Sequence, residues 1–327
     1  MADEGRVVTR PGGGRGPAGA VLVTGASTGI GYACAMRMCS RGWGVLAGVR
    51  READAERLRA EMRRGGRQAG VFSELEPVLL DVTSAEQVAA LPGTINGWLS
   101  RWGLEGLRGV VNNAGVAVAG PLECVPLEEV RRQLEVNTLG ALAVSQACLP
   151  MLRRWAAGSG AGGGVAAGRP TARIVMISSI SGRNAAPLLG PYAMSKFAME
   201  AMADGLRREL RAVKAGVDVS VVQPGAIATP IWAKPTGRET WERGAAGAGV
   251  RTLYGAMVPA VEARIAKVAE GAAPVGLVAD AVEHALCDAR PFARRLVGAD
   301  AKLTALLGSA LPARWMDALV ARALGLS

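Results

Sequence analysis

The sequence contains a single histidine, His284, among its 327 residues. Zinc sites often take imidazole ligands, and hydrolases of the Ser-His or Cys-His kind need an imidazole base. Because His284 stands alone in an expected helix, a histidine-based zinc or hydrolase site is not predicted. No metal site of any kind is expected.

Cysteine is also scarce. There are five, an odd number, and no two of them form a C-x-x-C pair, so neither a disulfide framework nor a thiolate zinc site is indicated. Buried free thiols fit a reducing compartment, and we expect a cytoplasmic location. The five are Cys34, Cys39, Cys124, Cys148 and Cys287.

Long apolar runs are missing as well. No stretch of 18 or more apolar residues exists, so no segment is expected to span a bilayer. Residues 1–18 are polar, lack the apolar core of a secretory signal and are predicted to form a disordered tail. Residues 301–327 carry apolar side chains at helical spacing, which predicts an amphipathic helical extension. It could pack on the rest of the chain, on a partner subunit or, as a peripheral contact, on a membrane surface.

Acidic residues are outnumbered by basic ones, and the formal net charge is +10 with a pI near 10.0. Such a balance is typical of proteins that bind nucleic acid or anionic membranes. Here the arginines are spread along the chain and form no continuous basic helix, so nucleic acid is not predicted as a partner. A charge-driven binding protein stays as a rival hypothesis, and its binding would fall steeply with salt.

A glycine-rich turn follows the first expected strand. Residues 20–24 are apolar and β-branched, Gly25, Gly29 and Gly31 come next, and a helix then runs to about Gly42. Strand, glycine turn and helix in this order predict a dinucleotide site, because the backbone can approach a pyrophosphate and the helix N-terminus meets its charge. The spacing is G-x3-G-x-G.

A second set of residues suggests chemistry. Ser179 follows a buried strand, RIVMISS, and Tyr192 and Lys196 lie four apart in an expected helix, so they share a face. An ammonium close to a phenol favours the phenolate, and we expect the pKa of Tyr192 to fall toward roughly 7. Such a tyrosine can exchange the proton of an alcohol while hydride moves at the same carbon, with Ser179 holding the oxygen.

Five motifs, together with Ser179, Tyr192 and Lys196, resemble the classical short-chain dehydrogenase/reductase family over residues 19–298. The motifs are TGASTGIG (24–31), LLDVTS (79–84), VVNNAG (110–115), EVNTLG (135–140) and QPGAIATP (223–230). The resemblance implies a doubly wound, mostly parallel α/β sheet (a Rossmann fold) in a single domain.

The resemblance also implies roles for individual residues. Tyr192 would be the acid/base, Lys196 its perturber and ribose ligand, Ser179 the anchor of the substrate oxygen, and Asn137 a member of a proton relay. Cofactor contacts are implied for Gly25, Ser27, Thr28, Gly29, Ile30, Gly31, Arg50, Arg51, Asp81, Val82, Asn113, Ala114, Gly115, Tyr192, Lys196, Pro224, Gly225, Ile227 and Thr229.

The expected cofactor is NADP(H). The second strand ends at Val49 and is followed by Arg50 and Arg51, where an NAD enzyme normally carries a carboxylate for the ribose 2′-hydroxyl. The family's other basic position, just before the second glycine, is Thr28, so half of the usual phosphate clamp is missing. NAD(H) therefore stays as the alternative.

The catalytic domain is expected to cover residues 19–300. Within it, the glycine- and alanine-rich residues 156–168 predict a flexible insertion. Residues 230–274 correspond to the family's substrate lid, in which Trp232, Trp241 and Tyr254 suggest an apolar pocket.

The expected activity is interconversion of a secondary alcohol and a ketone. The sequence after Tyr192 is similar to those of the retinol, hydroxysteroid and 3-hydroxybutyrate dehydrogenase branch of the family. This similarity implies a lipophilic substrate and a homodimer or homotetramer. The alternative is a non-catalytic NADP-binding sensor or scaffold, which would bind cofactor without turnover.

Overall fold

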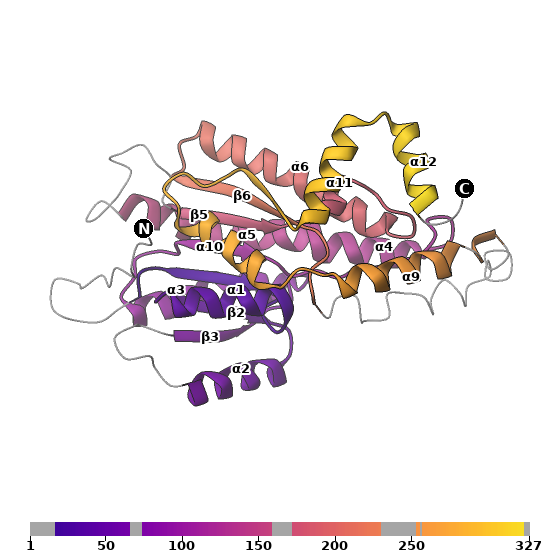
Figure 1. The fold of residues 1–327 in the computed structure, drawn as a ribbon. Coiled ribbons are helices and arrows are strands. Elements are labelled where there is room, and N and C mark those ends of the chain that lie inside the picture. Colours follow the sequence, from indigo (N-terminus) through magenta and orange to yellow (C-terminus); the bar gives the residue numbers. More distant parts are fainter. Residues whose placement is uncertain (1–16, 66–73, 159–171, 230–252, 256, 324–327) are drawn as a thin grey trace.

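A computed structural model describes residues 17–65, 74–158, 172–229, 253–255 and 257–323. Its centre is a seven-stranded sheet in which every neighbouring pair is parallel, in the order β3-β2-β1-β4-β5-β6-β7 (Figure 1). The order reverses between β1 and β4, which confirms the expected doubly wound fold. The strands are β1 Ala20–Thr24, β2 Gly44–Val49, β3 Glu74–Leu79, β4 Gly109–Asn112, β5 Ala172–Ile177, β6 Val217–Pro224 and β7 Arg294–Val297.

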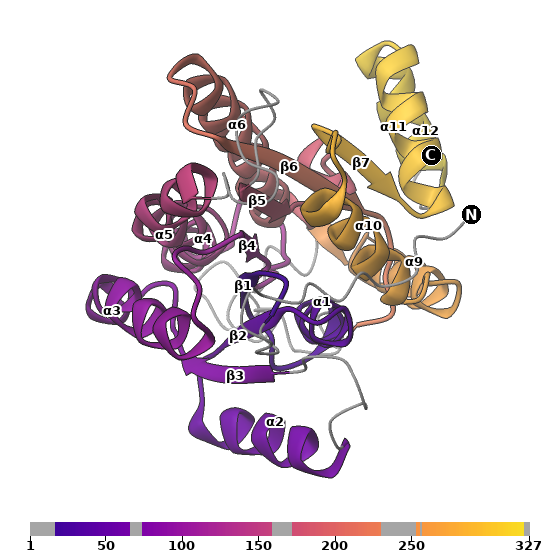
Figure 2. The ribbon, with the colours of Figure 1, turned by 90° about the vertical axis from the view of Figure 1, so that its left-hand side faces the viewer.

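Helices cover both faces of this sheet (Figure 2). α1, α2 and α10 pack on one face, and α3, α5 and α6 pack on the other. The helices that the structure describes are α1 Gly29–Ser40, α2 Glu52–Gly65, α3 Ala85–Trp102, α4 Leu127–Leu134, α5 Gly140–Gly158, α6 Gly190–Ala212, α9 Met257–Glu270, α10 Gly276–Cys287, α11 Ala299–Ala310 and α12 Ala313–Ala323.

The two faces create two apolar cores, and β1 shows how the sequence builds them. Ala20 and Leu22 join the core under α3, α5 and α6, whereas Val21 and Val23 join the core under α1 and α10. Side chains alternate across a strand, so a strand covered on both faces needs apolar residues at every position. The continuous apolar run AVLVT satisfies this need, and all five residues are buried.

A long helical stretch follows Pro126 and contains an irregular turn. α4 and α5 are joined by a π-helical segment, Glu135–Leu139, in which the backbone N–H of Gly140 bonds to the carbonyl of Glu135. The extra residue of such a turn changes which side chains face inward, and π turns are frequent at functional sites. Asn137 lies in the middle of this turn.

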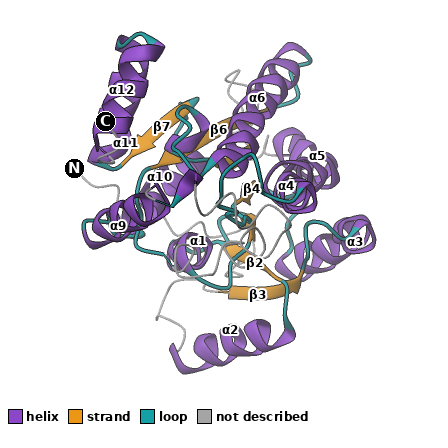
Figure 3. Cartoon of the chain, turned by 90° about the vertical axis from the view of Figure 1, so that its right-hand side faces the viewer, coloured by secondary structure: helices purple, strands orange, loops and turns teal. Residues whose placement is uncertain are grey.

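One boundary prediction needs correction. Residues 156–158 were assigned to the insertion but belong to α5, where Ala156 is buried in the core. Residues 159–168 lie outside the described part. Over the predicted helical extension, 301–327, the structure has two helices, α11 and α12, with a break at Leu311 between them, and residues 324–327 lie outside the described part. Both helices stand beyond the β7 edge of the sheet (Figure 3).

Much of the predicted disordered tail and of the predicted lid lies outside the described residues. This applies to residues 1–16 and 230–252, and therefore to Trp232 and Trp241. Of the lid, α9 and the short segment before it are described, and Tyr254 donates a hydrogen bond of 2.7 Å to Glu123. In the described part of the chain, no helix is long and apolar enough to cross a membrane.

Candidate active site

The carboxyl ends of the central strands meet a cavity, where open α/β sheets place their ligands. Residues from the loops after β1, β4, β5 and β6 line it, together with two side chains of α6. The lining residues are Ile30, Asn113, Gly115, Val116, Ile177, Ser178, Ser179, Tyr192, Lys196, Pro224, Gly225, Ile227 and Thr229. Most of these were predicted site residues, and sequence positions up to 199 apart thus meet in one place.

The glycine turn after β1 needs its glycines. Gly25 and Gly29 have φ angles of +64° and +60°, a region that favours glycine. A Cβ on Gly31 would lie 2.3 Å from the carbonyl oxygen of Gly25 and 2.4 Å from the side-chain nitrogen of Asn113. Gly31 therefore lets the turn pack directly on the loop after β4.

Hydrogen bonds hold these two loops together. The Thr24 hydroxyl accepts from the backbone N–H groups of Asn113 and Ala114, at 3.0 and 2.9 Å. In return, the Asn113 amide donates to the carbonyls of Thr24 and Gly25, at 3.0 and 3.1 Å. Asn113 thus acts first as a clamp on the turn, and Thr24, which sequence reasoning missed, is its main partner.

The start of α1 suits an anionic group. Thr28 is its N-cap residue and makes no side-chain capping bond, and the first turn contains no acidic side chain. The backbone N–H groups at this end therefore have no acceptor within the cap, and the positive end of the helix dipole faces the turn. In the cavity itself, the buried Ser178 hydroxyl has no hydrogen-bond partner among the described residues. Both features fit a bound dinucleotide.

Tyr192 and Lys196 project together from α6, as their spacing predicted. The Lys196 ammonium nitrogen lies 5.7 Å from the centre of the Tyr192 ring and donates a 2.8 Å hydrogen bond to the carbonyl of Ile177 at the end of β5. Ser179 shares a hydrogen bond with the Tyr192 hydroxyl and accepts one from the backbone N–H of Ser181 at 3.1 Å. The three groups form one buried cluster.

Burial dominates the electrostatics of this cluster. It raises the pKa of Tyr192 to about 12, although the Ser179 hydrogen bond acts to lower it. It also lowers the pKa of Lys196 to about 8, against the opposing charge of Glu200. The expectation of a Tyr192 pKa near 7 is thus wrong for the chain by itself, because desolvation disfavours the phenolate. At neutral pH Tyr192 carries its proton and Lys196 its charge.

Asn137 lies beside this cluster and is fully engaged. Its amide nitrogen donates to the carbonyl of Val116 and to the Ser195 hydroxyl, both at 2.9 Å, and its oxygen accepts from the Val116 N–H at 2.8 Å. Ser195 in turn donates to the carbonyl of Tyr192 at 2.8 Å. The Asn137 side chain therefore fixes the loop after β4 to the helix that carries Tyr192.

The residues predicted to contact the adenosine part of the cofactor are polar and charged, apart from Val82. Asp81 accepts from the N–H and hydroxyl of Thr83, at 3.0 and 2.7 Å. Burial acts to raise the pKa of Asp81, but these bonds and the charge of Arg50 lower it overall. Val82 is buried against Gly140. Arg51 donates to Asp54 at 2.9 Å, and the charge of Arg50 acts on Asp81.

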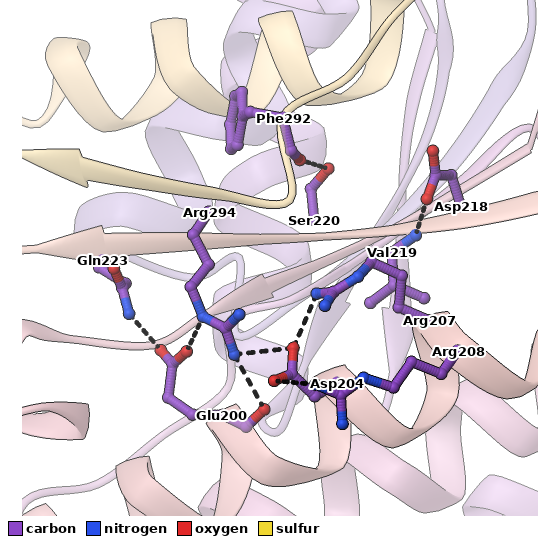
Figure 4. A network of polar contacts seen from close by, with 10 residues as sticks. All are labelled: Glu200, Asp204, Arg207, Arg208, Asp218, Val219, Ser220, Gln223, Phe292 and Arg294. Carbon is purple, nitrogen blue, oxygen red and sulfur yellow. Dashed lines mark hydrogen bonds and ion pairs between the residues drawn. The ribbon is translucent and has the colours of Figure 1, made fainter.

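A buried polar network anchors the catalytic helix from behind (Figure 4). Glu200, four residues after Lys196, accepts from Gln223 at 2.9 Å and from Arg294 at 2.8 Å. Arg294 also contacts Asp204 at 2.8 Å. The network ties α6 to β6 and β7, and Glu200 also packs against Gly182, just after Ser179.

Sequence reasoning missed Glu200 as well as Thr24. Glu200 continues the i, i+4 row of Tyr192 and Lys196, and a carboxylate on a buried row was a signal that could have been used.

The match to known proteins is extensive. A family model described as short chain dehydrogenase matches residues 19–239. The chain belongs to the short-chain dehydrogenase/reductase family. It is therefore an oxidoreductase of that family.

Among curated proteins, the chain is 38% identical to 3-amino-tetrahydro-pyrrolizinone reductase of Xenorhabdus hominickii over 67% of its own length and 66% of the reductase. It is 33% identical to mouse retinol dehydrogenase 5, covering 92% of this chain and 87% of that one. It is 30% identical to an NADPH-dependent 3-dehydrocapnine reductase of Ornithobacterium rhinotracheale, covering 90% and 94%.

Solved structures give the same answer for the fold. A short chain dehydrogenase from Burkholderia cenocepacia in complex with NADP is 26% identical, with a TM-score of 0.61 over 94% of this chain and 98% of that one. A family member from Burkholderia phymatum in complex with NAD is 21% identical, with a TM-score of 0.68 over 89% and 92%.

Proposed function

We propose that this dehydrogenase interconverts a secondary alcohol and a ketone, with NADP(H) as the preferred cofactor. The observation that carries the proposal is the buried cluster of Ser179, Tyr192 and Lys196 at the wall of a cavity next to the glycine turn. The turn, the start of α1, Asp81 and the loop after β4 would hold the dinucleotide, and Pro224, Gly225, Ile227 and Thr229 would hold its nicotinamide end. When bound, the nicotinamide supplies or accepts hydride.

Residues of the chain supply the proton that the carbonyl oxygen needs. In reduction, Ser179 donates a hydrogen bond to the carbonyl oxygen, and the Tyr192 hydroxyl transfers its proton to that oxygen as hydride reaches the carbon. The phenolate that remains is stabilised by the Lys196 ammonium, which the Ile177 carbonyl holds in place. Asn137 would belong to the path that returns a proton. A protonated Tyr192 at neutral pH suits the reductive direction.

The substrate is proposed to be lipophilic. Retinol dehydrogenase 5 and 17-beta-hydroxysteroid dehydrogenase type 6 are named for lipophilic substrates, and the chain shares 33% and 32% identity with them. The decisive experiment measures initial rates with NADPH and NADH against a panel of ketones, steroids and retinoids. Cofactor binding with no turnover on any carbonyl would instead favour the sensor or scaffold hypothesis.

Arg50 is expected to set the cofactor preference. It follows β2, is exposed, and its charge reaches Asp81 at the adenosine side. One guanidinium–phosphate hydrogen bond corresponds to a preference for NADPH of about ten- to a hundredfold. Arg50→Asp should reverse it, because the variant loses the phosphate partner and gains an acceptor for the ribose hydroxyls. The measurement is kcat/KM for both cofactors, and a variant that still prefers NADPH would contradict the role.

Glu200 should control the alkaline limb of the pH profile. Its charge raises the pKa of Lys196, which burial lowers to about 8, so Glu200→Gln lowers that pKa further. Lys196 then loses its charge at a lower pH. For ketone reduction, kcat/KM should therefore begin to fall at a lower pH than in the wild type, in which the fall is expected near pH 8. Glu209→Gln, an exposed change on the same helix, is the matched control. An unmoved limb in Glu200→Gln would show that Glu200 does not act on Lys196.

A homodimer or homotetramer is proposed from the apolar surface of the π turn and α6. Leu139, Met194 and Phe197 are each nearly half exposed, and Ala201 is exposed beside them. Leu206, further along α6, is partly buried against the core and does not belong to this surface. Light scattering at micromolar concentration should give at least a dimer, and Phe197→Glu should shift it toward monomer. A monomeric wild type would contradict the proposal.

A cytoplasmic location is proposed, because buried thiols such as Cys34 and Cys148 suit a reducing compartment.

A further inference from the structure

Arg57 of α2 folds back onto the glycine turn. One terminal nitrogen of its guanidinium donates to the backbone carbonyl of Ser27, and the other donates to Glu61 at 2.9 Å. The guanidinium carbon lies 6.0 Å from the centre of the Tyr32 ring on α1. The side chain is therefore held between α1, α2 and the turn rather than extended into solvent.

Two neighbouring arginines behave differently. Arg59 of α2 pairs with Glu52, and Arg51, just before the helix, pairs with Asp54, so both contact residues of α2 itself. Arg57, in contrast, donates one hydrogen bond to a backbone carbonyl 30 residues earlier in the chain. Arg57 is half-buried and pairs with Glu61 along α2, yet it also reaches the turn, a contact that α2 alone does not require.

The position of that carbonyl suggests a reason for this contact. Ser27 directly precedes Thr28, the position at which the turn lacks the basic residue that the family resemblance leads one to expect. The Arg57 guanidinium thus brings a positive charge from α2 to the part of the turn where the sequence supplies none. Arg50 directly follows β2, and the backbone N–H of Ala26 in the turn donates to the carbonyl of Gly48 in that strand at 2.9 Å, so the end of β2 lies against the same turn.

We propose that Arg57 binds the 2′-phosphate of NADP(H) as the second arm of a clamp with Arg50. The proposal rests on the NADP preference proposed above. A guanidinium has five N–H donors, and the two contacts described use two of them, which leaves capacity for a phosphate. The contacts with Ser27 and Tyr32 hold the side chain before the ligand arrives, so less rotamer entropy is lost on binding.

The test is direct binding of two fragments that differ only in the 2′-phosphate. Isothermal titration calorimetry of the full chain with adenosine 2′,5′-bisphosphate and with AMP separates phosphate recognition from catalysis. Arg57→Gln should weaken the bisphosphate by about tenfold or more and leave AMP unchanged. Arg59→Gln, one of the arginines that stay on the helix, should change neither.

The outcomes separate this inference from the function on which it rests. A wild type that binds the bisphosphate no better than AMP overturns the NADP preference itself. A wild type that prefers the bisphosphate, with an Arg57→Gln variant that keeps the full preference, overturns only the role of Arg57. An equal loss for both fragments would show that Arg57 merely shapes the turn, and would also overturn the proposal.

Discussion

Replacing Tyr192 by phenylalanine is expected to lower turnover by about 10²–10⁴-fold, the usual worth of a positioned acid or base. The ring stays in its buried place on α6, and only the hydroxyl that shares a hydrogen bond with Ser179 is lost. Because the proposed dinucleotide contacts come mainly from other residues, cofactor affinity should stay nearly constant. Single-turnover rates and a fluorescence titration with the reduced cofactor measure the two quantities.

The decisive comparison is between those two readouts. A Tyr192→Phe enzyme that keeps more than about a tenth of the wild-type rate would remove Tyr192 from the acid/base role. A loss of affinity equal to the loss of rate would show instead that the hydroxyl serves binding.

Lys196→Met is expected to raise the free energy of unfolding and to lower the turnover rate strongly. Burial lowers the pKa of Lys196 from 10.5 to about 8, so keeping the ammonium charged at pH 7 costs the folded state about 3 kcal/mol. A neutral methionine of similar length removes that cost but loses the hydrogen bond from the charged ammonium to Ile177, worth about 1.5–3 kcal/mol. The free energy of unfolding at pH 7 should therefore still rise, by about 1 kcal/mol.

The stabilisation expected from Lys196→Met depends on pH. The folded pKa lies below the unfolded one, so the cost is complete below about pH 8 and disappears as the pH rises through 10.5. Urea unfolding at pH 7 and pH 10 should therefore show the gain at the lower pH alone. Turnover should fall by at least about 10²-fold, since the phenolate of Tyr192 would face no cation. A variant less stable than wild type at pH 7 would contradict the cost assigned to this lysine.

The fold could be predicted from the sequence because strands, turns and helix faces are determined by residues close together in the chain. A short β-branched apolar run such as AVLVT that ends in a glycine turn indicates a strand covered on both faces, and the turn itself uses glycines with positive φ. The spacing of Tyr192 and Lys196 fixed their common face for the same reason. These features require no knowledge of distant contacts.

What the sequence did not predict depends on distant partners. The high pKa of Tyr192 comes from burial, which is decided by the whole cavity wall rather than by the neighbouring lysine. Arg57 donates to the carbonyl of Ser27, 30 residues earlier in the chain, which no local pattern predicts. Glu200 has its partners on β6 and β7, 23 and 94 residues away.

The strand order has a consequence for how the chain acquires its shape. β1 pairs with β4, and Val21 lies beside Gly109, so the centre of the sheet closes a loop of nearly ninety residues. Such sequence-distant, parallel pairing slows folding and leaves open strand edges in the intermediates. The strands β3-β2-β1-β4 all lie within the first 112 residues. On the ribosome, the residues of the glycine turn and of its Asn113 clamp are therefore synthesised before the helix that carries Tyr192.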